Sequence, residues 1–385
     1  MSILPGPSSQ FKPAPLESWA CALYGHRFKE LVGEWPWRGR LRGTAMADKC
    51  ETVSAVITAG DATASKAVYG DSKAFLSVSG RPMVVGLALT LQSVPEVSEV
   101  WVVGNLSRLQ EAFASPEVRG ALEKPLHLVE QGRNLLENAW ETYRKTLSQD
   151  TEAGRDPVGD EIDTPILFLS ADLPFATAEE LSAFVRDSLA LPECDYALGL
   201  VPEEAMLGFA PKAPGEPGIE VAFFNIREGR LRQSNLHFAR PGRIGNLFRI
   251  EEMYELRHQK KFINMAGLAL RIMFSRAGGP RIFFFYLLMH LGGWADRWRF
   301  RRFADFLRRG VSITRVEKAI SGILDTRFRF LITEAGGCGL DIDTEQEYDV
   351  VNARFDELWA AQKARAEKIY GVPAIGGPET PARDS

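Results

Sequence analysis

An aspartate follows an apolar run of the sequence at a position where a metal ion could bind. Asp172 comes just after 165–170, which has the composition of a buried strand. A carboxylate at the end of such a strand is costly unless it is paired or holds a cation, and Mg²⁺ prefers oxygen ligands together with phosphates. The alternative is a helix N-cap, but the next helix is predicted to start near Thr177, which places Asp172 too early for that role. We therefore predict that Asp172 binds Mg²⁺.

Asp341 and Asp343 form a second acidic motif, about 170 residues further along the chain. They precede a predicted helix, for which Thr344 and Glu347 have the spacing of a capping box. Capping and metal binding are compatible, because the residue before a capped helix can point into a site. Two acidic motifs at predicted edges of one sheet indicate a metal site more specifically than either motif alone.

A loop of small residues, which begins with Ala59, Gly60 and Asp61, follows the first predicted strand. This position is at the carboxyl edge of the predicted sheet, where open α/β folds bind ligands. Gly60 would let backbone N–H groups approach phosphate oxygens, and Lys66 and Lys73 could neutralise their charge. A glycine after a strand also fits an ordinary tight turn, so this loop alone leaves both interpretations open.

The segment 72–84 resembles the sequence PKALLPVGGKPMV of a large nucleotidyltransferase family, which includes the sugar-nucleotide pyrophosphorylases and the MobA-like (molybdopterin guanylyltransferase-like) enzymes. In that family a loop of the form LAGGxGxRM, followed by PK, wraps a triphosphate. The resemblance implies that Lys73 contacts phosphate and that Gly80-Arg81-Pro82 is the turn that opens a helix.

Both acidic motifs carry the same resemblance. Residues 170–175 resemble the GDxP strand end of the family, and 341–349 resemble the DIDTPEDL element near the C-terminus of MobA-like enzymes. The resemblance implies that Asp172 and Asp343 bind the catalytic Mg²⁺ and that Asp341 orients or joins this metal site. It covers about 51–200 and 325–365.

The loop after the first strand departs from the family pattern. Its second glycine is absent, the loop is longer, and the usual arginine is missing, with Lys66 as the nearest substitute. Arginine and lysine are not interchangeable where a phosphate is clamped by two hydrogen bonds. These departures bear on the affinity for triphosphate and on whether the loop is active.

Gln131, Gly132 and Asn134 follow the third predicted strand, where members of the family often place a polar loop that reads the base. We name them as nucleotide-binding candidates with Ala59 to Asp61. An equally good interpretation of this segment is a plain helix start capped by asparagine.

Asn235, His237 and Arg243 lie within one short stretch, in the region where the family varies its acceptor site. Groups of this kind suit recognition of a phosphorylated acceptor. The alternative is a solvated loop with ordinary turn residues.

Short β-rich runs alternate with helical patterns from residue 51 onward. This alternation predicts an α/β fold with a mostly parallel, Rossmann-like sheet covered on both faces, of the type shared by nucleotidyltransferases and GT-A glycosyltransferases. The predicted strands are 53–58, 100–104, 126–129, 165–170, 196–201, 221–226 and 326–333. The predicted helices are 82–93, 106–113, 134–147, 177–189 and 345–369.

The composition limits the class of protein. The chain has 385 residues, a net charge of −4 and a pI of about 5.9, which is no signature of nucleic-acid binding. Its longest apolar run, 282–289, is far shorter than the ~20 residues of a membrane-spanning helix. The four cysteines show neither zinc spacing nor a disulfide framework, and the start has no secretory signal, so we expect a cytoplasmic protein.

Changes of composition along the chain predict its domain organisation. For the first region, an equally good interpretation is that translation starts at Met46. The predicted regions are a flexible tail (1–50), a nucleotidyltransferase core (51–245), a helical insertion rich in Phe and Arg (246–312), a return to the core with a closing helix (313–370) and a disordered tail (371–385).

The segment 281–309 combines Phe and Trp at helical spacing with many arginines. The plainest interpretation is a helical subdomain that packs its aromatic residues onto the core. Peripheral membrane contact through an interfacial amphipathic helix is the main alternative, and a dimer interface is another.

The motifs together predict a Mg²⁺-dependent nucleotidyltransferase. It would transfer NMP from a nucleoside triphosphate to a phosphorylated small molecule and release pyrophosphate, with Lys73, Asp172 and Lys66 as catalytic residues. No nucleophilic Ser or Cys is required, since positioning and electrostatics carry such a reaction. Two alternatives stay open: a GT-A-type glycosyltransferase, and a non-catalytic nucleotide-binding scaffold with a degenerate loop.

Overall fold

The structure is a computed structural model that describes residues 51–61, 67–213, 216–247, 288, 291, 300 and 307–373. The chain divides into two compact units, and all elements named below belong to the larger one, which comprises Lys49–Ala210 and Ile219–Ser385. Outside the described residues lie the predicted tail 1–50, most of the predicted insertion 246–312 and of its basic segment 281–309, and most of the predicted tail 371–385.

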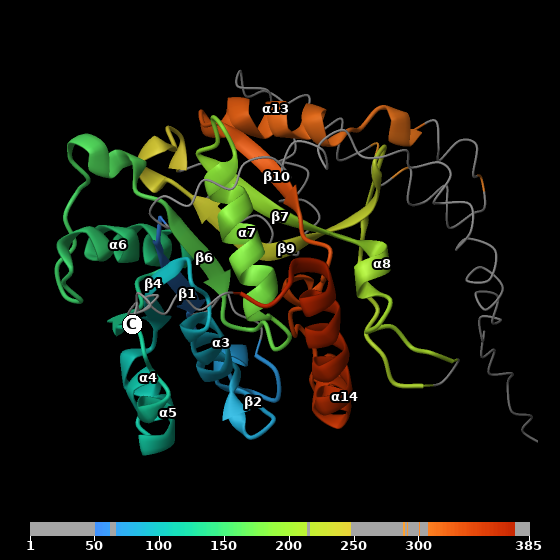
Figure 1. Cartoon of the computed structure of the whole chain (residues 1–385), viewed down its shortest axis with the longest axis horizontal. Coiled ribbons are helices and arrows are strands. Elements are labelled where there is room, and N and C mark those ends of the chain that lie inside the picture. Colours follow the sequence, from blue (N-terminus) through green and yellow to red (C-terminus); the bar gives the residue numbers. More distant parts are fainter. Residues whose placement is uncertain are drawn as a thin grey trace, which may run out of the picture. The chain divides into compact units, whose positions relative to one another are not determined.

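An eight-stranded mixed sheet forms the centre of this unit (Figure 1). Its order is β10-β7-β9-β6-β1-β4-β5, and β8 pairs with β9 at one side. The ladders that join β10 to β7, β6 to β1, β1 to β4 and β4 to β5 are parallel, whereas β9 runs antiparallel to its neighbours. The strands are β1 (Val53–Ala59), β4 (Val97–Gly104), β5 (Leu126–Glu130), β6 (Ile166–Ser170), β7 (Tyr196–Pro202), β8 (Phe224–Ile226), β9 (Gly229–Ala239) and β10 (Phe328–Ile332). The predicted α/β class with a mostly parallel sheet is confirmed.

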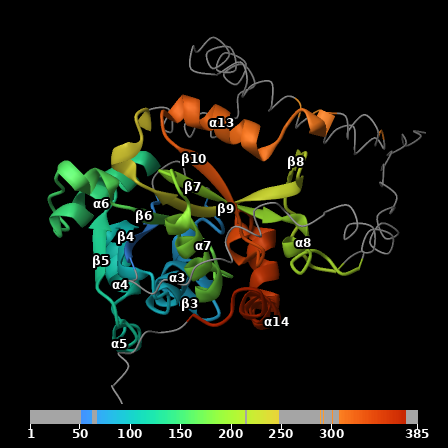
Figure 2. The same cartoon turned by 45° about the horizontal axis from the view of Figure 1, so that its top comes forward.

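Helices cover both faces of the sheet (Figure 2). One face packs against α3 (Met83–Gln92) and α7 (Ala178–Ala190), and the other against α6 (Leu135–Ser148) and α13 (Ile313–Leu324). Strands buried on both faces read as continuous apolar runs rich in Val, Ile and Leu, as residues 100–103 of β4 do. The remaining elements are η1 (Lys73–Phe75), β2 (Ser77–Val78), β3 (Arg81–Pro82), α4 (Leu106–Ala112), α5 (Pro116–Gly120), η2 (Gly159–Asp163), α8 (Glu203–Met206), η3 (Pro241–Arg243), η4 (Gly337–Gly339) and α14 (Glu345–Tyr370).

Most of the described helices start at a side chain that caps them. An oxygen of the N-cap side chain accepts a hydrogen bond from a free backbone N–H of the first turn, which satisfies a donor that the helix cannot. The capping residues are Asn105, Ser115, Asn134, Thr177, Ser312 and Thr344. None of the described helices has the length and apolarity to cross a membrane.

The strand β9 connects the two parallel parts of the sheet, and the sequence did not predict it. Its many polar residues conceal the alternation of apolar and polar side chains that is expected of a strand. In addition, its register with β7 shifts between Leu198 and Leu200. Gly199 lies at this shift, and a Cβ there would come within 2.1 Å of Ser234 Oγ on β9. The glycine therefore allows the two strands to approach, and Phe238 beyond the shift is fully buried.

The other predicted elements lie close to their expected bounds. The helices predicted at 82–93, 106–113, 134–147, 177–189 and 345–369 are α3, α4, α6, α7 and α14, each within two residues at its ends. The strands predicted at 221–226 and 326–333 are shorter than expected, and α13 was not predicted as a separate helix.

The burial of Phe238 predicts a stability effect. Phe238→Ala should lower the free energy of unfolding by about 3–5 kcal/mol, because the ring is 0% exposed between β6 and β7 and its loss leaves a cavity. Phe224→Ala on β8, where the ring is 45% exposed, should change it by less than about 1 kcal/mol. Urea denaturation measures both, and equal effects would contradict a core position for Phe238.

Candidate active site

The carboxyl ends of β1 and β6 lie side by side and place Asp172 beside the loop after β1. Thr58 pairs with Ser170 in the parallel ladder, and the N–H of Ala171 donates to the Thr58 carbonyl at 3.1 Å. The hydroxyl of Ser170 in turn donates to the carboxylate of Asp172. Asp172 is thus fixed at the sheet edge by its own strand, and it does not cap the helix α7, whose N-cap is Thr177.

The segment after β10 carries the other two aspartates and is anchored on α7. The fully buried carboxylate of Glu180 accepts the N–H groups of Gly336 and Cys338, each at 3.2 Å. Burial raises the pKa of Glu180, against the effect of these hydrogen bonds. Between them Gly337 lies so close to Phe175 that a Cβ would come within 1.9 Å of its carbonyl oxygen. The path of the chain toward Asp341 therefore depends on α7 and on this glycine.

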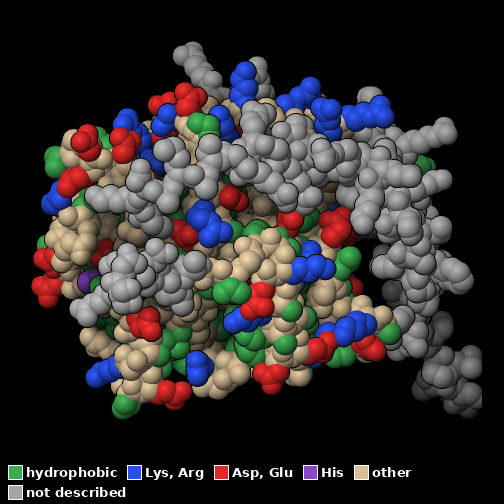
Figure 3. Space-filling view, in the orientation of Figure 1, with side chains coloured by type: hydrophobic (Ala, Val, Ile, Leu, Met, Phe, Trp, Pro, Cys, Tyr) green, Lys and Arg blue, Asp and Glu red, His purple; other side chains and the backbone are tan. Residues whose placement is uncertain are grey.

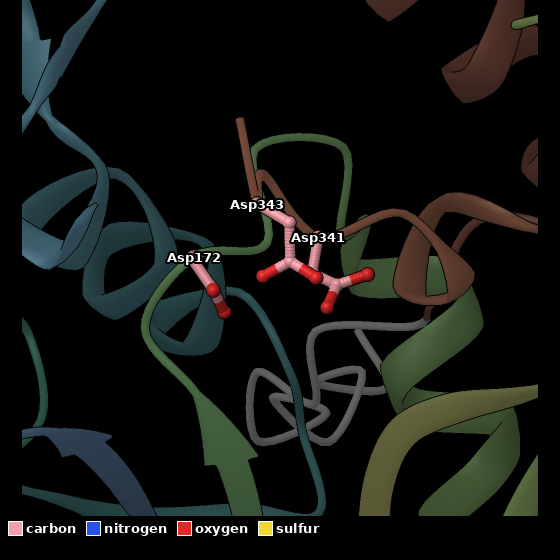
Figure 4. Close-up of side chains that lie close together, drawn as sticks. All are labelled: Asp172, Asp341 and Asp343. Carbon is pink, nitrogen blue, oxygen red and sulfur yellow. The ribbon is translucent and has the colours of Figure 1, made fainter. Parts of the chain in front are cut away.

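Asp172, Asp341 and Asp343 come together at this edge. One carboxylate oxygen from each lies within 4.8 Å of the others. Figure 4 shows the three carboxyl groups side by side, one from the loop after β6 and two from the segment before α14. Within the part of the chain that the structure describes, no other group of three acidic, His or Cys side chains is placed to hold a metal ion.

Two cationic side chains accompany the three carboxylates. The ammonium of Lys73 lies 2.6 Å from Asp172 Oδ2 and 2.8 Å from Asp343 Oδ1. Burial alone would lower the pKa of Lys73, but the charges and hydrogen bonds of the two aspartates outweigh it and raise the pKa. Arg232 donates to Asp341 Oδ1 and to the Gly339 carbonyl, both at 2.6 Å.

The sequence did not predict the contact of Arg232 with the aspartates, because this residue belongs to the unpredicted strand β9. It pairs with Val201 near the carboxyl end of β7, which brings its guanidinium to the same edge as the aspartates. Burial raises the pKa of Asp341, and the charge of Asp172 adds to this, while Arg232 opposes both. Arg232 therefore keeps Asp341 in place as a charged neighbour of the other two acids.

The three carboxylates fit a magnesium ion. They offer hard oxygen ligands at one point, which Mg²⁺ prefers in proteins, and Mg²⁺ sites commonly use one or two carboxylates with phosphates and water. The ammonium of Lys73 already bridges two of the acids, which marks the place as one that takes a cation. Asp172 and Asp343 would hold the ion.

The nucleotide-binding candidates form a second group along the same sheet edge. The Asp61 N–H donates to Gln131 Oε1 at 2.9 Å, and Gln131 Nε2 donates to the Asp61 carboxylate at 2.5 Å. The Gly132 N–H donates to Asn138 Oδ1 at 2.6 Å, and a Cβ on Gly60 would lie 3.3 Å from Gln131 and Asn138. The ends of β1 and β5 are thus tied together by amide side chains.

Two nucleotide-binding candidates have backbone or capping roles in the described structure. Ala59 is the last residue of β1 and is buried against the neighbouring strands. Asn134 caps α6, since its side chain accepts the N–H of Glu137 at 2.9 Å. Lys66, predicted as a catalytic residue, lies outside the described residues.

Arg108 on α4 contacts both ends of the loop after β1. Its guanidinium donates to both carboxylate oxygens of Asp71, at 2.7 and 3.0 Å, and lies 3.7 Å from Asp61. It also lies over the ring of Phe75, 4.0 Å from the centroid. Arg108 was not predicted from the sequence, because its contacts join segments that no motif links.

The three acceptor-binding candidates are not brought together. Asn235 and His237 lie along β9, where His237 pairs with Phe168 and Leu198 and contacts Tyr196 Oη through Nδ1 at 2.7 Å. Arg243 lies beyond the end of β9 and pairs with Asp163, which precedes β6, at 2.5 and 2.8 Å. The sequence predicted one short stretch that recognises the acceptor. These residues instead lie along and beyond an extended strand, which runs from the edge with the aspartates to the opposite edge of the sheet.

That opposite edge carries its own charged side chains. Asp195, Arg243, Asp325 and Arg327 line a shallow open pocket there, and Arg327 makes a bidentate pair with Asp195 at 2.5 and 2.7 Å. Figure 3 shows lysine and arginine side chains at the top of the view, over α13, which leads into the amino end of β10. These basic groups are therefore separate from the three aspartates.

Comparisons with known proteins find similarity in structure alone. No protein-family model matches the sequence, and no curated protein sequence matches it. A hypothetical transferase from Thermus thermophilus is 22% identical, with a TM-score of 0.45, over 77% of this chain and 99% of that one. CMP:2-keto-3-deoxy-manno-octonic acid synthetase complexed with CTP is 14% identical, with a TM-score of 0.42, over 80% and 99%. The 4-diphosphocytidyl-2C-methyl-D-erythritol synthase from Anaerococcus prevotii is 13% identical, with a TM-score of 0.37, over 80% and 100%.

The position of His237 predicts a pH effect on stability. Burial lowers the pKa of His237 to about 4, so the folded protein keeps the ring neutral. The unfolded chain binds this proton near pH ~6.5, and stability is therefore lost as the pH falls below that value toward about 4. Between about pH 7.5 and 5.5 the wild type should lose roughly 1 kcal/mol that His237→Gln does not lose. Urea denaturation at both pH values measures this, and identical pH dependence in the two proteins would show that the folded ring is protonated as readily as the unfolded one.

Proposed function

We propose that the protein is a Mg²⁺-dependent nucleotidyltransferase. It transfers NMP from a nucleoside triphosphate to a phosphorylated small molecule and releases pyrophosphate. One observation carries this proposal: Asp172 and Asp343, distant in sequence, meet at the carboxyl edge of the sheet with Lys73 between them. Open α/β sheets bind ligands at this edge, and Gly60 and Asp61 follow β1 at the same edge.

The charge of each side chain at this edge determines its proposed role. Bound Mg²⁺ would neutralise the triphosphate and the charge that develops on the leaving pyrophosphate. Lys73 would offer an ammonium to phosphate oxygens, while Asp61, Gln131 and Gly132 would hold the base or sugar. An oxygen of the acceptor phosphate attacks the α-phosphorus as the bond to pyrophosphate breaks. Such transfer depends on positioning and electrostatics, so no side-chain nucleophile is needed.

Two further residues keep the acids in place. Arg232 holds Asp341 and the Gly339 carbonyl, and Glu180 holds the turn that precedes them. Neither needs to touch the substrates. Both act by keeping Asp343 and Asp172 at a separation that one ion can bridge, because a small misplacement of reacting groups costs much of the rate.

The test is pyrophosphate release together with thermal shift. CTP, GTP, UTP and ATP are each added with Mg²⁺, with and without sugar or polyol phosphates. One nucleotide should raise the melting temperature, and pyrophosphate should appear only with an acceptor. Asp172→Asn should lower the rate by about a hundredfold or more, because it removes a ligand of the ion that would stabilise the transition-state charge.

The matched control is Asp163→Asn. It removes the same charge at the opposite edge of the sheet, where Asp163 pairs with Arg243, and it should leave the rate within about twofold of wild type. A nucleotide-dependent shift that is the same in Asp172→Asn, or no shift with any nucleotide, would remove the support for an enzyme and favour a scaffold. Transfer of a sugar from a nucleotide sugar would favour a glycosyltransferase.

Arg108 generates a separate prediction about triphosphate binding. Arg108→Lys should weaken binding of the nucleotide identified above by about tenfold, since one ammonium cannot keep both oxygens of Asp71 and the face of Phe75. Equilibrium titration measures the affinity. Arg119→Lys, an exposed arginine on α5, is the control and should leave it unchanged. An equal affinity in Arg108→Lys would show that the loop does not depend on this guanidinium.

A further inference from the structure

The ammonium of Lys73 lies where the proposed metal ion would contact the protein. It contacts Asp172 at 2.6 Å and Asp343 at 2.8 Å, and its side chain is only 15% exposed. An ion held by these same two oxygens would approach each to about 2.0–2.1 Å, and it cannot do so while the ammonium contacts both. The lysine must therefore leave before these oxygens can hold the ion.

The charges of the cluster determine when this exchange is favourable. Three carboxylates with Lys73 and Arg232 carry one net negative charge. A divalent cation that displaces Lys73 leaves its ammonium without a carboxylate partner in a partly buried space, where charges are poorly screened. A triphosphate brings several negative charges and offers Lys73 new partners. The charges of the site are therefore balanced when metal and triphosphate bind together, and they are not balanced when the metal binds alone.

The two cations differ in how firmly they are held. Arg232 donates to Asp341 and to the backbone of Gly339, so it is fixed by two separate groups. Lys73 has an unbranched, flexible side chain with a compact charge. Its backbone is held, because the Phe75 N–H donates to Ser72 and the Leu76 N–H donates to Lys73 itself. A fixed backbone with a flexible side chain lets the ammonium change partners within a short reach.

We propose that Lys73 is an exchangeable counter-ion, which occupies the metal position until a triphosphate draws it away and so couples metal binding to nucleotide binding. This inference rests on the proposed function and adds to it a dependence of metal binding on triphosphate binding. The protein binds a divalent cation weakly by itself. It binds the cation well only together with the triphosphate, whose phosphate oxygens then receive the ammonium of Lys73.

The experiment measures the two affinities separately in the full chain. Mn²⁺ binding without nucleotide is followed by electron paramagnetic resonance for wild type and Lys73→Met. Binding of CTP, GTP, UTP and ATP with Mg²⁺ is followed by equilibrium titration. Lys73→Met should bind Mn²⁺ about tenfold more tightly than wild type and the recognised triphosphate about tenfold more weakly. A lysine with a merely structural role would weaken both when removed.

Lys318→Met is the matched control, since it removes an equal charge from the exposed surface of α13 and should change neither affinity. If Lys73→Met does not fold, Lys73→Gln makes the same test with a polar head. The exchange is overturned if Lys73→Met binds Mn²⁺ no more tightly than wild type does. If Asp172→Asn at the same time abolishes the Mn²⁺ that binds together with nucleotide, the proposed function still stands. No Mn²⁺ bound by any protein, with or without any nucleotide, overturns the exchange and the metal site together.

Discussion

Three carboxylates that lie within 4.8 Å of one another repel, and this repulsion governs the design of the site. In a partly buried space the repulsion is much larger than in water, so the charges must be balanced by cations that the fold supplies. The chain supplies two of them by different means. Arg232 satisfies Asp341 with a rigid guanidinium that also binds the backbone, whereas Lys73 bridges Asp172 and Asp343 with a point charge. The pair of Arg232 and Asp341 is permanent, whereas Lys73 can be exchanged for another cation.

The fold brings the acids together by long-range packing. Asp172 follows the end of β6, and its position is set by the parallel register with β1. Asp343 follows a turn that reaches the site only because Glu180 accepts its N–H groups inside the protein. Glu180 lies on α7, the helix that follows Asp172 in the chain. The separation of the two acids therefore depends on the end of β6 for Asp172 and on α7 for the segment that carries Asp343.

The parts of this arrangement that the sequence predicted are the local ones. Alternating apolar runs and helical patterns were sufficient for the sheet and its main helices, and the acids and Lys73 stand in short motifs that keep their spacing. The capping box of Thr344 and Glu347 was predicted for the same reason and is present. Magnesium binding and the roles of these residues stay predictions, because they concern partners outside the chain.

What the sequence did not predict depends on contacts between distant segments. The polar residues of β9 and the register shift beside Gly199 concealed this strand, so the contact of Arg232 with Asp341 was not predicted either. The same omission produced the acceptor group of Asn235, His237 and Arg243, since residues close in sequence were assumed to be close in space. An extended strand separates successive residues by ~3.3 Å each, which is enough to carry the chain across the sheet.

The missing arginine of the loop after β1 shows how a charge can be supplied by a distant residue. The electrostatic interaction of a phosphate with a cation depends on the distance between them and not on where the cation stands in the sequence. Arg108 reaches this loop from α4, where Phe75 supports the plane of its guanidinium and Asp71 accepts two hydrogen bonds. Its distance of 3.7 Å from Asp61 places it at the start of the loop as well. Both described ends of the loop therefore contact a guanidinium, which is paired with Asp71 and close to Asp61, and a search for the loop motif alone would pass over it.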